Sequence, residues 1–256
     1  MKHSTTEEVM STSTDRAADL KHRLDRVRHR ISAAASASGR SEPALIVVTK
    51  YFPASDVAAL AALGVRDVGE NKAQEAEAKA AELAGNGLRW HFIGQLQTNK
   101  AKSVVRYASA VHSVDRPGLV AALGKAMAAE NRRRTEAGQP SRAPLDCYLQ
   151  LDLRSGEDLD PGRGGARPAD MLEMAAAVAA DPSLSLAGLM AVAPLGEDPA
   201  AAFARLQELS AELTSRYPEA AGISAGMSQD LEAAVAHGAT HLRIGSDVLG
   251  PRPAVG

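Results

Sequence analysis

Residues 44–53 read Ala-Leu-Ile-Val-Val-Thr-Lys-Tyr-Phe-Pro. The run is apolar and rich in β-branched residues over the length of one strand, which is typical of a strand buried on both faces. It ends on a lysine, Lys50. A lysine at the carboxyl end of a buried strand is partly desolvated, and this favours the neutral amine that attacks carbonyl carbons. Taken alone, the stretch is more typical of a lysine that opens a solvated loop.

The composition limits the class of protein. The chain has 256 residues, 45% of them hydrophobic but only 3% aromatic, so we expect a core of Ala, Leu, Val and Ile. The 29 basic and 31 acidic residues are well mixed, with a formal net charge of -2, and this argues against a nucleic-acid partner. The single cysteine, Cys147, excludes an internal disulfide framework and suits a reducing compartment.

The N-terminal segment is polar and rich in Ser and Thr. It lacks the apolar stretch of a signal peptide, and no run approaches the roughly 18 apolar residues of a membrane span. We therefore expect a cytoplasmic protein that makes no membrane contact. Residues 1–14 are predicted to form a disordered tail, and residues 15–256 a single domain.

Strand-like and helix-like segments alternate along the chain. Leu20, Leu24, Val27 and Ile31 form the stripe of a first helix that ends near Gly39. Strands and helices in alternation indicate βαβ units and a parallel sheet. Eight units predict an α/β fold, a closed (β/α)8 TIM barrel with an additional N-terminal helix, since such a barrel needs about 250 residues. The eight expected strands are 45–49, 65–68, 89–93, 110–114, 146–153, 186–192, 222–225 and 241–244.

The functional site of a barrel lies at the carboxyl ends of its strands, where a phosphate often binds between the loops after strands seven and eight. Met227 and Ser228 follow the seventh expected strand, and Gly245 and Ser246 follow the eighth. Ser228 stands at a predicted helix N-cap, where its hydroxyl and the following backbone N–H groups would face an anion. Each feature alone also fits an ordinary cap or turn, but their occurrence together favours a phosphate site.

Arg243 has the same strand parity as Gly245, so both face one side of the last strand. If that side is inward, a guanidinium lies beside the phosphate loops and within reach of a ring nitrogen. A reactive lysine, phosphate donors and a buried cation are together what pyridoxal 5'-phosphate (PLP) requires of a protein.

Six motifs resemble those of the pyridoxal phosphate homeostasis proteins (the YggS/PROSC family), which share the barrel of the alanine racemase N-terminal domain. The resemblance covers roughly residues 20–252. They occur in the order that the family has. The motifs are Val48-Thr49-Lys50 with Pro53, Gly69-Glu70-Asn71, Trp90-His91-Phe92-Ile93-Gly94, Gly188-Leu189-Met190, Gly226-Met227-Ser228 and Arg243-Ile244-Gly245-Ser246.

The resemblance implies a monomeric or weakly associating barrel that holds PLP as a Schiff base on Lys50. It also implies an intracellular role as a carrier and buffer of PLP in vitamin B6 homeostasis, without established catalytic turnover, with apo PLP-dependent enzymes as recipients. Met190 either touches the cofactor ring or fills the barrel mouth. The residues expected to bind the cofactor are Lys50, Asn71, Met190, Met227, Ser228, Arg243, Gly245 and Ser246.

Two features depart from the family pattern. Phe52 stands where many members have a second lysine, so a transfer of PLP between neighbouring lysines at this place is in doubt. Residues 155–168 form a long Gly-rich connection, and a loop of that length in a compact domain is either functional or mobile.

Two alternatives remain open at the level of the sequence. The first is a PLP-dependent amino-acid racemase-like enzyme. Such enzymes add a C-terminal β-domain, for which we expect no room because Gly256 closely follows the eighth strand. The second is an aldolase that uses Lys50 without a cofactor and binds a sugar phosphate at the phosphate loops.

Overall fold

The computed structural model describes residues 4–154 and 164–252, with side chains from residue 15 onward. Eight parallel strands form a closed barrel in which each strand pairs with the next in sequence and β8 pairs with β1. The predicted (β/α)8 barrel is therefore confirmed. The strands are β1 (Ala44–Val48), β2 (Asp67–Glu70), β3 (Arg89–Phe92), β4 (Ala108–Val114), β5 (Leu145–Gln150), β6 (Leu184–Met190), β7 (Gly222–Ser224) and β8 (His241–Ile244).

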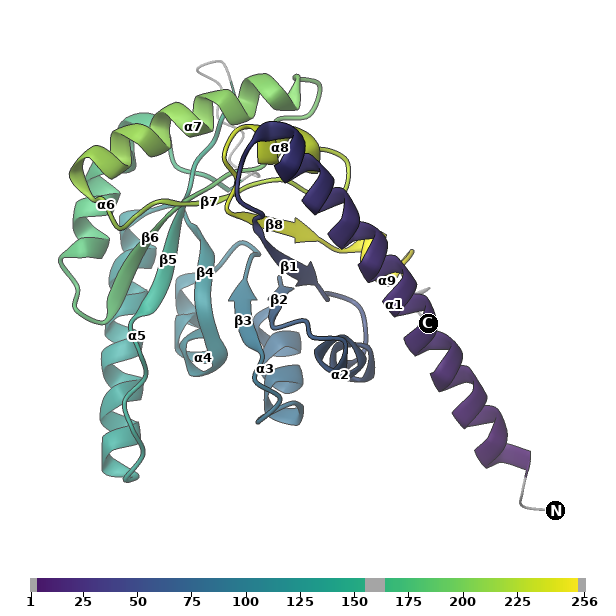
Figure 1. Ribbon diagram of the computed structural model, residues 1–256. Coiled ribbons are helices and arrows are strands. Elements are labelled where there is room, and N and C mark those ends of the chain that lie inside the picture. Colours follow the sequence, from purple (N-terminus) through teal and green to yellow (C-terminus); the bar gives the residue numbers. More distant parts are fainter. Residues whose placement is uncertain (1–3, 155–163, 253–256) are drawn as a thin grey trace.

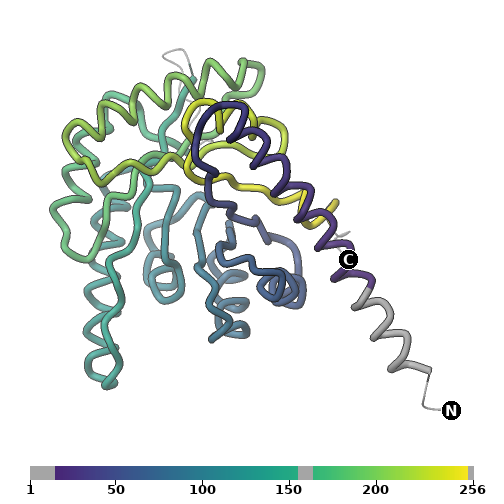
Figure 2. Tube along the Cα trace, in the orientation of Figure 1, coloured from purple at the N-terminus to yellow at the C-terminus, as the bar shows by residue number. Residues whose placement is uncertain are grey.

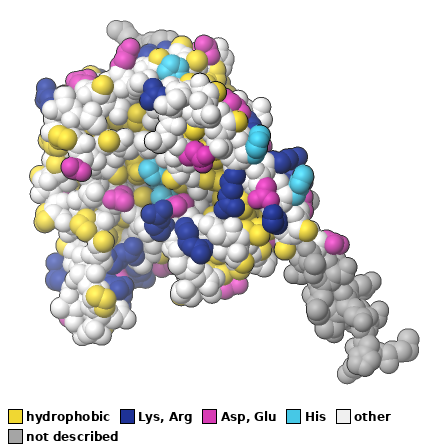
Figure 3. Space-filling view, in the orientation of Figure 1, with side chains coloured by type: hydrophobic (Ala, Val, Ile, Leu, Met, Phe, Trp, Pro, Cys, Tyr) yellow, Lys and Arg dark blue, Asp and Glu magenta, His cyan; other side chains and the backbone are white. Residues whose placement is uncertain are grey.

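The helices lie around the outside of the strands (Figure 1). None of those in the described part of the chain has the length and apolar character needed to cross a membrane. Basic and acidic side chains are interspersed on the face seen in Figure 3. The helices are α1 (Ser4–Ser38), α2 (Ala54–Ala62), α3 (Ala73–Glu82), α4 (Ala101–Tyr107), α5 (Pro117–Glu136), α6 (Met171–Ala179), α7 (Pro199–Arg216), α8 (Leu231–Ala236) and α9 (Ser246–Leu249), with short 3-10 turns at Thr98–Lys100 and Pro168–Asp170.

The additional N-terminal helix packs against the last elements of the chain. The stripe of Leu20, Leu24, Val27 and Ile31 is at most 3% exposed. Helix α1 contacts α2, α8 and α9, so the N-terminal helix lies beside the C-terminal segment (Figure 2). It ends at Gly39, whose φ of 63° is the left-handed conformation that ends many helices. The predicted tail, residues 1–14, lies outside the residues described in full and stays a prediction.

The second strand is displaced from its predicted range. It begins at Asp67 and continues through Gly69 and Glu70, because its register pairs Asp67 with Ile46 on one side and with Arg89 on the other. Glu70 was expected in a loop, but it is 1% exposed at the end of this strand. Most of the connection at 155–168 lies outside the described residues, so its predicted role stays open.

Polar rings occupy the barrel interior, where aliphatic side chains usually dominate. His112 is fully buried and stacks on Tyr148, with ring centroids 4.3 Å apart and planes 11° from parallel. Desolvation lowers the pKa of His112 well below its ordinary value, and the charge of Arg243 adds to this. Desolvation likewise lowers the pKa of His241 to about 4. Both rings are therefore neutral in the folded chain near neutral pH.

The buried histidines predict an acid-sensitive fold. In the unfolded chain His241 takes up a proton below its ordinary pKa of 6.5, whereas in the folded chain it does so only near pH 4. His241 therefore leaves the free energy of unfolding unchanged above pH 6.5. As the pH falls from 6.5 toward 4, the unfolded state binds a proton that the folded state does not, and the free energy of unfolding decreases. At about 1.4 kcal/mol per pKa unit, His241 should lower the free energy of unfolding by up to about 3 kcal/mol over this range.

Urea unfolding at a series of pH values measures this loss. His241→Gln should flatten the pH dependence, and His22→Gln, a change at an exposed histidine of α1, should leave it as in the parent chain. An equally steep dependence in His241→Gln would contradict the assignment.

Gly94 lets the loop after β3 pack against the loop after β2. A Cβ atom added at Gly94 would lie 2.3 Å from the carbonyl oxygen of Asn71 and 2.7 Å from its Cα atom. These are backbone atoms, which cannot move aside as the end of a flexible side chain can, so the two loops would have to separate. The glycine therefore sets how closely Asn71 approaches the third strand.

Gly94→Ala should lower the free energy of unfolding by about 1–3 kcal/mol, the usual cost of overpacking. Gly118→Ala is the matched control, because Gly118 lies in the first turn of α5 with no atom within 4 Å of an added Cβ. Alanine favours helix at such a position, so this control should be neutral or slightly stabilising. Equal stability of the two variants would show that the loops separate without cost.

Candidate functional site

A cavity of about 360 Å³ opens at the carboxyl ends of β1, β7 and β8. Its position agrees with the general location of sites in (β/α) barrels. The structure brings together six of the eight residues predicted for the site. They are Lys50, Met227, Ser228, Arg243, Gly245 and Ser246.

The other two predicted residues lie elsewhere. Asn71 lines a neighbouring cavity of about 310 Å³, together with Gln95 and Lys100. Its side-chain oxygen is buried and has no hydrogen-bond partner among the described residues. Met190 is 2% exposed and packs in the barrel interior against Ala110 and Tyr148. A role for either residue in binding a ligand stays a prediction.

A buried ionic cluster holds the end of β1 that presents Lys50. The ammonium of Lys79 on α3 donates to the carbonyl oxygen of Thr49 at 3.0 Å and to Oε1 of Glu70 at 2.8 Å. The Thr49 hydroxyl donates to the same Glu70 oxygen at 2.6 Å. Desolvation raises the pKa of Glu70, although the hydrogen bonds from Lys79 and Thr49 oppose this. The backbone immediately before Lys50 is thus fixed from the side of the second strand.

The residue after Lys50 adopts an unusual backbone conformation. Tyr51 has a φ of 73°, in the left-handed region that side-chain-bearing residues rarely enter. Its N–H donates to Oε1 of Glu75 at 2.8 Å, and the same oxygen accepts from Lys79 at 2.7 Å. Burial raises the pKa of Glu75, but these hydrogen bonds outweigh it and the net shift is downward. The charged carboxylate therefore stabilises the turn that directs Lys50 into the cavity.

The loops after β7 and β8, which are predicted to bind a phosphate, come together at Ser228 and Ser246. The hydroxyl oxygens of Ser228 and Ser246 lie 3.4 Å apart. Ser246 begins α9, and the backbone N–H groups of Ser246 and Asp247 donate to no acceptor among the described residues. The predicted N-cap at Ser228 is wrong. Helix α8 begins two residues later than such a cap requires, with Asp230 as its N-cap, because Asp230 closes the turn by accepting from the N–H of Met227 at 2.5 Å.

Arg243 points into the barrel, which settles the orientation that its strand parity left open. It is 5% exposed, and its guanidinium donates to the Ser224 hydroxyl at 2.7 Å and to the Ala191 carbonyl at 2.9 Å. It forms no ion pair within residues 15–154 and 164–252. Burial lowers its pKa to about 10, and the charge of Asp230 opposes this only in part. The group therefore remains a cation at neutral pH.

The cavity has an excess of positive charge. Lys50, Arg243 and Arg252 line it, against the single carboxylate of Asp230 among the lining residues. The Arg252 guanidinium lies 4.3 Å from the ring centroid of Tyr51, and the Lys72 ammonium lies 5.3 Å from it. Such a concave cationic surface favours an anionic ligand.

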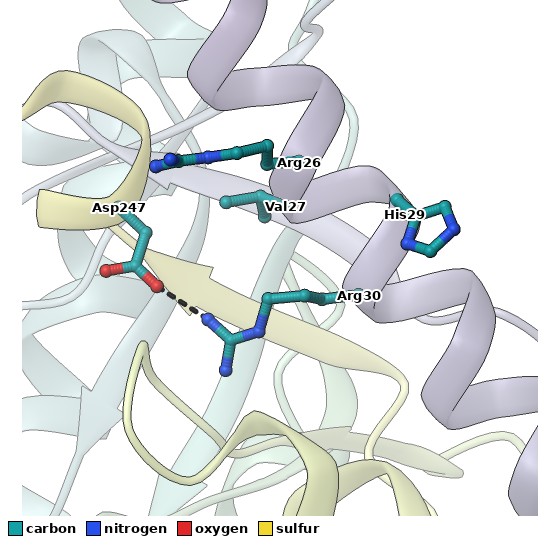
Figure 4. A pocket seen from close by; sticks show the side chains of 5 residues that line it. All are labelled: Arg26, Val27, His29, Arg30 and Asp247. Atoms are coloured by element: carbon teal, nitrogen blue, oxygen red, sulfur yellow. Dashed lines mark hydrogen bonds and ion pairs between the residues drawn. The ribbon is translucent and has the colours of Figure 1, made fainter.

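Helix α1 supports both phosphate loops from outside the barrel. Figure 4 shows Arg30 extending from α1 to Asp247 of α9, which it meets at 2.7 Å. The same guanidinium donates to the Ser228 carbonyl at 3.1 Å and pairs with Glu232 of α8 at 2.9 Å. One side chain thus links the loop after β7 to the loop after β8.

Sequence reasoning missed several residues that form the site. Glu75 and Lys79 stand four apart in an Ala-rich helix, a spacing that also occurs on solvated helix faces. The burial of Lys79 and the partial burial of Glu75 follow only from the docking of α3 against β2. Arg30 lies outside the apolar stripe of its helix, and nothing in the sequence near it indicates that it contacts residues about 200 positions later.

Comparisons with known proteins place the chain in a family. The family model for the alanine racemase N-terminal domain matches residues 23–253. A pyridoxal phosphate homeostasis protein of Mycobacterium tuberculosis is 43% identical over 260 residues, which cover 95% of this chain and 96% of that protein. One of Escherichia coli is 37% identical over 242 residues, which cover 91% of this chain and 97% of that protein.

Solved structures agree with this placement. PipY of Synechococcus elongatus, in a structure with PLP bound, is 32% identical, with a TM-score of 0.72 and coverage of 90% of this chain and 100% of PipY. The fold, the ordered motifs and these likenesses lead to one conclusion. The chain belongs to the alanine racemase N-terminal domain family and, within it, to the pyridoxal phosphate homeostasis proteins.

Proposed function

We propose that this protein binds PLP as a Schiff base on Lys50 and acts in the cytoplasm as a monomeric carrier that buffers PLP and delivers it to apo-enzymes. The observation that carries the proposal is that Lys50, the neighbouring serines and Arg243, a cation with no ion-pair partner among the described residues, line one cavity. Relatives named for pyridoxal phosphate homeostasis, and the PLP-bound PipY structure, support it.

The described residues fit the chemical groups of PLP. The aldehyde would condense with the Lys50 amine, with loss of one water molecule. The phosphate suits the serine hydroxyls and the free N–H groups at the start of α9, since a phosphate accepts several charge-assisted hydrogen bonds. The buried guanidinium of Arg243 has no carboxylate partner in the described residues, so an anionic ligand would offset its burial.

A carrier role agrees better with Arg243 than a role as catalyst. PLP supplies an electron-withdrawing ring, and this ring is most effective when its nitrogen is protonated. A guanidinium beside that nitrogen disfavours the proton, because two neighbouring positive charges repel. Lys50 would therefore hold and release the aldehyde, while chemistry at an amino-acid α-carbon is weakened. The arginine alone does not forbid such chemistry, and a racemase-like activity is the alternative that turnover assays test.

Borohydride reduction followed by peptide mass spectrometry tests the covalent bond. A pyridoxyl adduct is expected on Lys50 after incubation with PLP. Lys50→Arg should lose the adduct and the yellow absorbance. Lys72→Arg is the matched control, since Lys72 lies beside the same tyrosine ring, and it should keep both.

Three other outcomes would overturn the proposal or redirect it. An adduct on a different lysine, or no adduct at all, contradicts a Schiff base on Lys50. A colourless protein that gains mass only with a sugar phosphate and borohydride indicates the aldolase.

The double variant Ser228→Ala/Ser246→Ala should retain PLP less well. Each charge-assisted hydrogen bond contributes roughly 1.5–3 kcal/mol, so the loss of the hydroxyls should raise Kd at least about tenfold. Ser215→Ala, at an exposed position of α7, is the control. Equilibrium dialysis with absorbance detection measures the change, and unchanged retention would place the phosphate elsewhere.

A further inference from the structure

A continuous chain of hydrogen bonds crosses the barrel interior and ends on Arg243. We name its members the interior chain: Asp67, His91, His112, Ser224 and Arg243. Asp67 Oδ1 lies 2.8 Å from His91 Nε2, and His91 Nδ1 lies 2.9 Å from His112 Nε2. His112 Nδ1 lies 2.8 Å from the Ser224 hydroxyl, to which Arg243 donates at 2.7 Å. The five residues come from β2, β3, β4, β7 and β8.

The interior chain is buried along its length. His112 and Ser224 are 0% exposed, and His91 and Asp67 are each 7% exposed. Buried polar groups destabilise a fold unless each is paired. An aliphatic interior would avoid this requirement, as it does in most barrels. Packing of the core therefore does not explain why the interior chain is present.

The donors and acceptors allow one direction. A guanidinium only donates, so the Ser224 oxygen accepts from Arg243 and its own hydrogen points to His112 Nδ1. His112 then carries its proton on Nε2 and donates to His91 Nδ1. His91 in turn carries its proton on Nε2 and donates to the Asp67 carboxylate. Every group is satisfied, with both rings neutral.

The opposite direction is unfavourable. His112 would then donate from Nδ1 to Ser224, which already accepts from Arg243, and the serine hydrogen would lose its acceptor. His91 would also need both ring protons in order to donate to His112 and to Asp67. Desolvation lowers the pKa of His112, which agrees with a neutral ring. For Asp67, burial raises the pKa, but the hydrogen bonds from His91 and Arg89 outweigh it, so the group stays a carboxylate.

Aromatic packing fixes the plane of the central ring. Tyr148 stacks on His112 with ring centroids 4.3 Å apart. Gly222 leaves the space for Tyr148, because a Cβ atom there would lie 2.7 Å from the tyrosine ring. Within this plane, the hydrogen bonds to His91 and Ser224 direct the two nitrogens of His112.

We propose that Asp67, His91, His112 and Ser224 are positioning residues that hold the Arg243 guanidinium in one orientation and set the protonation state of the ring nitrogen of a bound ligand. This inference rests on the proposed function for the identity of that ligand. The Ser224 and Ala191 oxygens take two of the five guanidinium N–H groups and leave three for a ligand. A carboxylate at the far end polarises the hydrogen bonds between it and the cation.

The first experiment uses the ligand-free full chain. The protein is uniformly labelled with ¹⁵N, and each imidazole signal is assigned to its residue by through-bond correlations. Long-range ¹H–¹⁵N NMR spectra then report which nitrogen of each imidazole carries the proton. Near neutral pH, both His91 and His112 should be neutral with the proton on Nε2 and should exchange it slowly. A proton on Nδ1 of His112, or a doubly protonated His91, would overturn the direction of the interior chain and with it the proposal.

The second experiment follows the absorbance of the PLP-loaded protein as a function of pH. Asp67→Asn and Ser224→Ala should shift the absorbance maximum and move the titration of bound PLP to higher pH, because a less firmly held guanidinium disfavours the ring proton less. Ser113→Ala is the control, because it removes a buried hydroxyl next to His112 that has no hydrogen-bond partner among the described residues. It should match the parent spectrum.

The outcomes separate the two proposals. Spectra identical to that of the parent in both Asp67→Asn and Ser224→Ala, with PLP bound, would overturn the positioning role. If Ser224→Ala does not fold, Asp67→Asn still decides, since it preserves the shape of the side chain. Absence of a PLP absorbance band in the parent protein would overturn the proposed function, whereas the NMR result would still report on the direction of the interior chain.

Discussion

The pairing of β1 with β8 is the contact on which the site depends. It joins strands about 200 residues apart and places Ile46 opposite Arg243 and Val47 opposite Ile244. The end of β1 presents Lys50, and the end of β8 leads into Ser246, so closure of the barrel brings amine and hydroxyl to one cavity. Gly245 permits the close approach, because an added Cβ atom would lie 3.2 Å from the Val48 carbonyl oxygen.

Buried charge is handled differently on the two sides of this cavity. Beside β1, the charge of Lys79 is balanced within the protein, because Lys79 is paired with both Glu70 and Glu75. Beside β8, Arg243 bonds only to neutral oxygens among the described residues. A buried ion pair is compatible with a rigid support, whereas a buried cation without a counter-ion retains its attraction for an anion from outside. The ion pairs of Lys79 therefore suit the positioning of Lys50, and the cation of Arg243 suits the binding of an anionic ligand.

The additional N-terminal helix contributes to the site as well as to the core. Its apolar stripe covers the outside of the barrel, while Arg30 on its polar side reaches the loops after β7 and β8. The loops that carry Ser228 and Ser246 therefore depend on a helix that precedes the whole barrel. Because Arg30 contacts both loops at once, it limits how far Ser228 and Ser246 can move apart.

The sequence by itself determined the fold class, the order of the strands, the stripe of α1 and six residues of the cavity. It could do so because strand and helix periodicity, and the strand-end positions of Lys50 and Ser246, are local properties of the chain. The burial of Glu70 and Lys79, the turn at Asp230, the left-handed Tyr51 and the order of the interior chain were decided only by the tertiary structure. Each depends on partners brought together by barrel closure and helix docking, and hydrogen bonds between distant strands leave no periodic trace in the sequence.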